Sequence, residues 1–325
     1  HQSWIRMIKQ GLLNTARIAL QECMGLKQGE ILLVITDEPC RSVGEAFFVA
    51  GNNLGNESIL VEIVPRGTHG EEPPTCVAEM MKSVDVVVMP TSKSLSHTKA
   101  RREATKVGVR QASLPGITPE MMERGLSADY REIELLSNKM AEILTEGKEV
   151  HLTSESGTDL YLVIEAREGK PDTGINHTPG SFSNLPAGEA YIAPVEGTAN
   201  GVVVIDGSVA GVGIVKEPIV IKVENGYAVE IDGGKEAGKL LELLRDFDKR
   251  ARNIAELGIG TNSKAVLSGA VLEDEKVMGT VHIALGSNVS FGGSVDVPIH
   301  LDGVIKSPTL IVDGRVVMEK GKIMV

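Results

Sequence analysis

Four nearly continuous apolar runs in the first part of the chain constrain its fold more than any other feature. They are "ILLVITD" (31–37), "SILVEIV" (58–64), "VDVVVMP" (84–90) and "VRQASLPG" (109–116). Runs of this kind are typical of strands buried on both faces. Stretches with helical periodicity separate them, so we expect helices at 8–25, 41–54, 74–82, 96–107 and 118–146. This alternation predicts an open parallel sheet covered by helices, an α/β domain over residues 1–147.

The sequence pattern changes after residue 147. The segment "VHLTSESGTDLYLVIEAR" (150–167) contains two strand-like runs joined by a Ser/Gly turn, which predicts a hairpin. Short strands and glycine-rich turns follow, with one helix expected at 235–253. We therefore expect residues 148–325 to form an α+β domain dominated by antiparallel pairing.

The composition restricts the possible partners. The formal net charge of −11 argues against nucleic acid or an anionic membrane, because both attract positively charged surfaces. No apolar run approaches a membrane span, and the N-terminus lacks the layout of a signal peptide. The three cysteines lack metal-ligand spacing and read as reduced thiols, so we expect a cytoplasmic protein.

Ionisable residues interrupt several apolar segments of the second half. In "VPIHLDGVI" (297–305), His300 and Asp302 are two residues apart and would share one face of a strand. Three more residues stand in comparable segments, and these are Glu189, Glu256 and His282. Burying such groups is costly unless they are paired or bind a metal. Nitrogen and oxygen donors suit Zn²⁺, Mn²⁺, Co²⁺ or Fe²⁺.

Each of these residues also has a simpler explanation. A single histidine in a strand is more often a hydrogen-bonded core residue than a ligand, and Asp302 could merely orient the imidazole of His300. Glu256 by itself is typical of a solvated strand end. Composition and spacing therefore leave a metal site as the minority hypothesis.

The order of four short motifs adds a resemblance. "NLPAGE" (184–189), "AELGIGTN" (255–262), "VHIALGSN" (281–288) and "IHLDGVI" (299–305) together resemble the thermophilic metallo-aminopeptidase family typified by aminopeptidases T and S. The resemblance implies that the five ionisable residues surround one or two divalent ions in the C-terminal domain. It further implies a homodimer that hydrolyses short peptides or small amides with a metal-activated water, with Glu256 as the first candidate for the base.

The chain also departs from this family. The peptidases carry a tyrosine shortly after the first histidine, whereas "ALGSNVSFGG" has none, and the interval from His282 to His300 is shorter than expected. The iron-dependent dioxygenase that cleaves the ring of 2,5-dihydroxypyridine resembles the same structural group, and His282, His300 and Asp302 would supply its two-histidine, one-carboxylate site. A third possibility is an inactive relative that binds a small molecule between the domains.

Three residues outside this set are candidates for substrate binding. His97 and Arg101 follow the apolar run 84–90, and ligands of open α/β sheets bind at the carboxyl ends of strands. A solvated basic helix face is the more frequent explanation of such residues. His177 lies in the polar loop 175–184 and could line the entrance of a site.

Overall fold

The computed structural model describes residues 9–325, and their contacts divide them into two compact units. The first unit runs to Tyr130 and regains the segment Gly174–Ala187, and the second contains Arg131–Thr173 and Gly188–Val325. This division differs from a boundary at residue 147, because Met140 and Leu144 of the preceding helix belong to the core of the second unit. No helix in the described range is long and apolar enough to span a bilayer.

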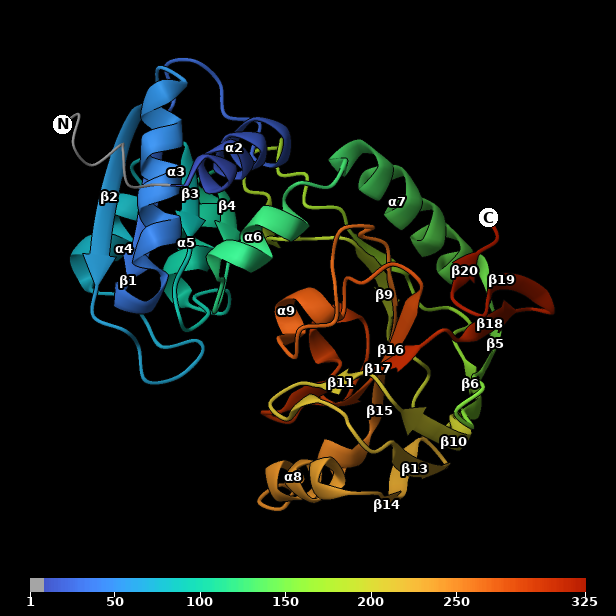
Figure 1. Cartoon of the computed structure of the whole chain (residues 1–325). Helices are drawn as coiled ribbons and strands as arrows, with labels where there is room; N and C mark the ends of the chain where they lie inside the picture. The colour runs from blue at the N-terminus through green and yellow to red at the C-terminus, as the bar shows by residue number, and fades with distance from the viewer. Residues whose placement is uncertain (1–8) are drawn as a thin grey trace. The chain divides into compact units, whose positions relative to one another are not determined.

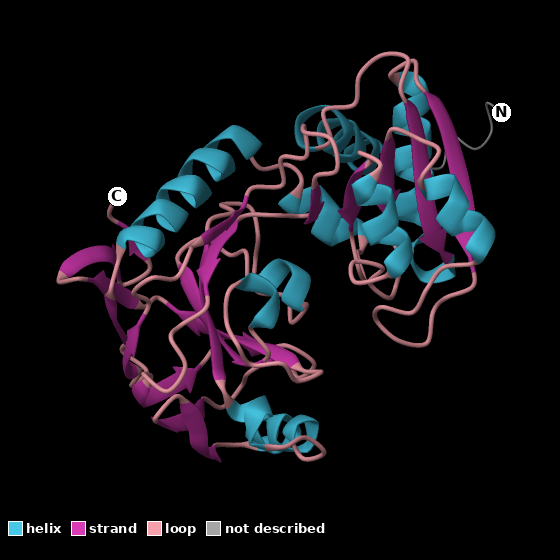
Figure 2. Cartoon of the chain, turned by 180° about the vertical axis from the view of Figure 1, so that it is seen from behind, coloured by secondary structure: helices cyan, strands magenta, loops and turns pink. Residues whose placement is uncertain are grey.

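The first unit is built on a five-stranded sheet in the order β2-β1-β3-β4-β8, with every neighbouring pair parallel (Figure 1). Its strands are β1 (Ile31–Asp37), β2 (Glu57–Ile63), β3 (Val86–Met89), β4 (Arg110–Ser113) and β8 (Phe182–Asn184). Its helices are α2 (Gln10–Ile18), α3 (Arg41–Asn53), α4 (Thr75–Met81), α5 (Lys99–Lys106) and α6 (Pro119–Gly125). Helices lie on both faces of this sheet (Figure 2), as the apolar runs predict.

Two expectations about the first half are corrected. The stretch 118–146 forms two helices, α6 and α7 (Tyr130–Glu146), because the helical pattern is interrupted at residues 126–129. There the hydroxyl of Tyr130 donates to the carbonyl of Gly125, which closes the turn between the helices. The segment 175–184, expected to be a loop, contributes strand β8 to the sheet. Residues 1–8, which include the expected first residue of the helix 8–25, lie outside the described range.

The second unit contains two antiparallel sheets, in agreement with the predicted texture of this half. The eight-stranded sheet has the order β14-β13-β10-β6-β5-β18-β19-β20, and the seven-stranded sheet has the order β12-β11-β17-β16-β15-β9-β7. The strands of the first are β5 (Glu149–Thr153), β6 (Asp159–Val163), β10 (Asn200–Ile205), β13 (Ile219–Glu224), β14 (Tyr227–Asp232), β18 (Thr309–Val312), β19 (Arg315–Glu319) and β20 (Lys322–Ile323). Those of the second are β7 (Lys170–Asp172), β9 (Glu189–Ile192), β11 (Ser208–Val209), β12 (Gly213–Ile214), β15 (Ile254–Gly260), β16 (Thr280–Gly286) and β17 (His300–Lys306).

One hydrophobic core joins these two sheets with α7 and α8 (Lys235–Leu244). The helix expected at 235–253 ends early, and a 3-10 turn occupies Lys249–Arg252. A short helix, α9 (Val271–Asp274), precedes β16. Alternate residues of the central strands, such as Leu257 and Ile283, enter the core. The residues between them therefore face the other side of the seven-stranded sheet, where the candidate site lies.

Candidate metal centre

The five ionisable residues singled out in the sequence come together on one face of the seven-stranded sheet. Four adjacent strands carry them, namely β9, β15, β16 and β17. Registers fix their positions: His282 is opposite Gly258, and Asp302 is opposite Ala284. Because side chains alternate along a strand, Glu256 and His300 fall on the same face as these residues. Apolar neighbours of each residue go to the core, so burial of the strands forces the ionisable groups together.

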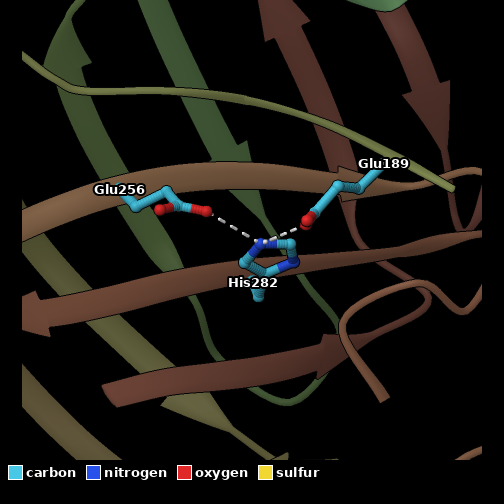
Figure 3. Close-up of side chains that lie close together, drawn as sticks. All are labelled: Glu189, Glu256 and His282. Atoms are coloured by element: carbon cyan, nitrogen blue, oxygen red, sulfur yellow. Dashed lines mark hydrogen bonds and ion pairs between the residues drawn. The ribbon is translucent and has the colours of Figure 1, made fainter. Parts of the chain in front are cut away.

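His282 lies between two carboxylates (Figure 3). Its Nε2 is 3.2 Å from Glu189 Oε2 and 3.2 Å from Glu256 Oε1, and its side chain is fully buried. The three ligand atoms lie close enough to hold a metal ion.

His300 forms a second group with Glu256 and Asp302. Its Nε2 is 3.3 Å from Glu256 Oε2 and 3.3 Å from Asp302 Oδ1. Its Nδ1 is 2.8 Å from the carbonyl oxygen of Ser287, which fixes the tautomer with the proton on Nδ1 and turns the Nε2 lone pair toward the carboxylates. Glu256 thus belongs to both groups, with one oxygen in each.

Several polar atoms of the site are buried without a well-aligned hydrogen bond, although two of them lie 3.2 and 3.3 Å from an imidazole nitrogen. They are Glu189 Oε2, His282 Nδ1 and Asp302 Oδ1. Native proteins pair nearly all buried polar atoms, because an unpaired one loses its hydration without compensation. Two of the three are carboxylate oxygens, the type of atom that a divalent cation binds. The donor set therefore fits a metal ion.

The pKa shifts of the site residues also indicate that the carboxylates favour a positive charge nearby. Burial acts to lower the pKa of His282, but the carboxylates of Glu189 and Glu256 outweigh it and hold that pKa well above its usual range. Burial likewise opposes a raised pKa of His300, and Asp302 and Glu256 outweigh it. Burial acts to raise the pKa of Asp302, yet the neighbouring imidazole of His300 lowers it. Without a metal, protons on the two imidazoles supply part of the missing positive charge.

A glycine makes room for His282. A Cβ atom added at Gly258 would lie 1.9 Å from His282 Nε2, so any side chain there would displace the imidazole. The sequence motif "AELGIGTN" therefore supplies both a carboxylate and the space that its neighbour requires.

Sequence reasoning missed Lys276, which is 1% exposed and belongs to the same site. Its Nζ is 2.7 Å from Glu189 Oε1 and 3.7 Å from Asp172 Oδ2, and it also contacts the carboxylate of Glu275. Burial acts to lower the pKa of Lys276, but these carboxylates raise it well above its usual value. Lys276 follows α9 in the charged run "EDEK", which looks like a solvated surface and gave no signal.

One aromatic residue lies beside His300, and a second packs against the first. The ring of Phe291 is edge-on to His300 at 5.9 Å between centroids, and Tyr191 is edge-on to Phe291 at 5.5 Å. Burial, followed by the nearby Glu189, raises the pKa of Tyr191, so its hydroxyl stays protonated. Tyr191 could have been found from the sequence, because it stands two residues after Glu189 and must share its face.

The three other candidates lie in the first unit. Arg101 is engaged locally: its Nε donates to the Ser96 carbonyl at 2.7 Å, and its guanidinium lies 4.5 Å from the ring centroid of Phe182. The Nε2 of His177 is 2.7 Å from the Glu22 carbonyl oxygen. His97 is an exposed residue, and partial desolvation of its ring lowers its pKa, as do Arg101 and Arg102. Their binding of a substrate stays a prediction.

Comparison with known proteins identifies the family. The family model described as 2,5-dihydroxypyridine 5,6-dioxygenase (NicX) matches residues 12–325, and the chain belongs to this family. A 2,5-dihydroxypyridine 5,6-dioxygenase of Pseudomonas putida strain KT2440 is 24% identical over 262 residues, which cover 75% of this chain and 72% of the relative.

Solved structures agree on the fold. The 2,5-dihydroxypyridine dioxygenase from Pseudomonas putida KT2440 superposes with a TM-score of 0.82 at 19% identity, covering 97% of both chains. Wild-type AmpT from Thermus thermophilus superposes with a TM-score of 0.71 at 18% identity, covering 98% of this chain and all of that one. The resemblance to the aminopeptidase T fold is therefore correct at the level of architecture.

The activity expected from that resemblance is wrong. A hydrolase of the aminopeptidase type, and hence a protease, is contradicted by the family match, which supports the alternative of a dioxygenase. The error has a physical origin. A set of glutamates, histidines and an aspartate on one sheet face is compatible with both chemistries, so the donor residues alone do not distinguish them.

Proposed function

We propose that this protein is a metal-dependent dioxygenase that opens the ring of a dihydroxylated pyridine or a close analogue. The observation that carries the proposal is the family match, which spans residues 12–325 and so includes every residue of the candidate metal centre. The relative from Pseudomonas putida is named for this reaction.

Glu256, His300 and Asp302 would hold the metal, and His282 would support it from the other oxygen of Glu256. Among the four ions compatible with these donors, we favour Fe²⁺, because the family match indicates oxygen chemistry and a three-residue set of imidazole and carboxylate donors leaves open positions for small molecules on that ion. A bound ferrous ion supplies the redox chemistry that activates dioxygen. The unpaired Oδ1 of Asp302 and the oriented Nε2 of His300 support this assignment.

The protein's own groups would position the substrate and its proton. Phe291, backed by Tyr191, presents an aromatic surface beside His300, which suits a flat aromatic ring. Glu256, with one oxygen near each histidine, is placed to accept the proton that a ring hydroxyl releases on binding. The apolar core behind the strands limits access of water from that side. Assembly as a homodimer and a cytoplasmic location stay predictions.

Oxygen uptake tests the proposal directly. Protein stripped of metal is reconstituted anaerobically with Fe²⁺, Zn²⁺, Mn²⁺ or Co²⁺ and mixed with 2,5-dihydroxypyridine in an oxygen electrode. We expect uptake with Fe²⁺ and loss of it in Asp302→Ala. His151→Ala is the matched control, because His151 is a strand histidine of the same unit that pairs with Asp159. Failure of every dihydroxylated ring tested to consume oxygen, with metal bound, would overturn the proposal.

A further inference from the structure

Lys276 places a permanent positive charge at one side of the candidate metal centre. The ammonium group is enclosed by three carboxylates, those of Glu189, Glu275 and Asp172. The ammonium group has three N–H donors, which matches its three carboxylate partners. The side chain of Lys276 is almost completely removed from solvent. Lysines are almost never fully buried unless they are paired, so the three carboxylates are what allow Lys276 to be buried here.

The structure locates this charge relative to the two possible metal positions. One potential position lies among Glu189, Glu256 and His282, and the other lies among Glu256, His300 and Asp302. Glu189 belongs only to the first. Its Oε1 accepts a hydrogen bond from Lys276 at 2.7 Å, so only Oε2 remains directed toward His282.

A second divalent ion at the first position would therefore meet two obstacles. It would share Glu189 with an ammonium group already bonded to it, and it would be repelled by that ammonium at short range. Two-metal sites keep their ions about 3.5–4 Å apart and need carboxylates to screen that repulsion. Here one oxygen of Glu189 is already occupied by the ammonium group of Lys276. The second position has no lysine among its ion-pair partners in the described chain.

We propose that the ammonium group of Lys276 takes the place of a second metal ion and restricts the centre to one ion per chain. This inference rests on the proposed metal centre and deepens it. Lys276 is then a positioning residue that sets the number of metal ions bound by the centre.

Metal stoichiometry tests the proposal without relying on catalysis. Stripped full-length protein is titrated with Co²⁺, an air-stable probe, by calorimetry, and bound cobalt is counted by elemental analysis after gel filtration. We expect one ion per chain for the wild type, two for Lys276→Met, and one for Lys276→Arg, which keeps the charge. Two ions in the wild type, or a single ion of unchanged affinity in Lys276→Met, would overturn the proposal.

Glu189→Gln provides a second measurement in case Lys276→Met does not fold. If Glu189 serves chiefly as the partner of Lys276, Glu189→Gln keeps one ion with affinity within about threefold of the wild type. Asp302→Asn should weaken binding by at least about 100-fold, as expected for a direct ligand. A loss as large in Glu189→Gln as in Asp302→Asn would contradict the proposal. Absence of any bound ion in the wild type would overturn the metal centre itself, a result distinct from two bound ions.

Discussion

The two units of this protein both bury charged residues in strands, but they compensate them differently. Arg110, in β4 of the first unit, is 5% exposed, and its guanidinium donates to the carbonyls of Met24 and Gly25 and pairs with Glu30. Asp302, in β17 of the second unit, is 7% exposed and keeps an oxygen without a hydrogen-bond partner. Burial of a charge is common to Arg110 and Asp302, and the two residues differ in how completely that charge is paired.

The clustering of incompletely paired atoms is the more informative difference. The first unit also has such atoms, on Asp37, Ser58, Gln111, Ser113 and Ser181, but in the described residues none of them belongs to a group of potential metal donors. In the described part of the second unit, all such side-chain atoms belong to Glu189, His282 and Asp302, which lie in one site. A single unpaired atom is a local cost to stability, but three that converge indicate a missing ligand.

Replacing one buried residue in each unit by alanine is expected to give the largest difference between the units. His300→Ala removes a donor of the centre, so we expect metal affinity to fall by at least about 100-fold and oxygen uptake to be lost, with the fold retained. Arg110→Ala removes the charge partner of Glu30 and leaves two carbonyls without their donor, so we expect about 3–5 kcal/mol of destabilisation with the metal count unchanged. Elemental analysis and urea unfolding measure the two effects. Equal metal loss in both variants would remove the distinction between the units.

Gly258→Ala tests the space around His282 without altering any donor. The added methyl would collide with the imidazole, so we expect metal affinity to fall by about 10–100-fold, the range found when support of a ligand is lost. Gly238→Ala is the matched control, because a Cβ at that helical position meets nothing within 4 Å. It should leave metal binding unchanged and add up to about 1 kcal/mol of stability. Wild-type affinity in Gly258→Ala, measured by cobalt titration, would show that His282 does not support the metal centre.

Phe291→Ala tests the aromatic surface beside the centre. An aromatic contact contributes about 0.5–1.5 kcal/mol, so we expect KM for the dihydroxylated ring to rise by up to about tenfold while kcat changes less. Val289→Ala, an exposed residue of the same turn, is the control. If KM is unaffected by loss of Phe291, the substrate does not lie against this surface.

The pH dependence of thermal stability is the smallest effect. In the metal-stripped protein the pKa values of His282 and His300 are raised, so their contribution to stability is complete below the unfolded value of about 6.5 and is lost as pH rises through the folded values. Metal binding requires neutral imidazoles, so it gains as pH rises. We expect the increase in Tm on adding Co²⁺ to grow by a few degrees from pH 6.5 to 8.5. An increase that shrinks with pH would contradict the assignment of the histidines as ligands.

Much of the fold and of the candidate site could be predicted from the sequence. The run 31–37 coincides with β1, and the two-residue periodicity of strands correctly placed His300 and Asp302 on one face. Lys276 could not be foreseen, because its burial depends on the close approach of the segment after α9 to the end of β15, where Asn262 bonds to the Lys276 carbonyl. Strand β8 was missed because three residues after a polar loop carry no periodic pattern.

The chemistry was harder to predict than the site. The five donor residues and their order are compatible with hydrolysis and with oxygen chemistry, and no residue pattern near them excludes either. What separates the alternatives is the family match over residues 12–325, which the motifs do not contain. Donor residues predict a metal more reliably than they predict its reaction.

Isotope labelling of the product tests the central claim most directly. Protein reconstituted with Fe²⁺ is allowed to turn over 2,5-dihydroxypyridine under ¹⁸O₂ in ordinary water, and in a parallel reaction under ordinary oxygen in H₂¹⁸O, with the products analysed by mass spectrometry after prompt quenching. A dioxygenase transfers both atoms of O₂ to the opened ring, so we predict two labelled atoms in the first reaction and no incorporation beyond solvent exchange in the second. Label that enters only from water, or an unopened ring under both conditions, would contradict the account.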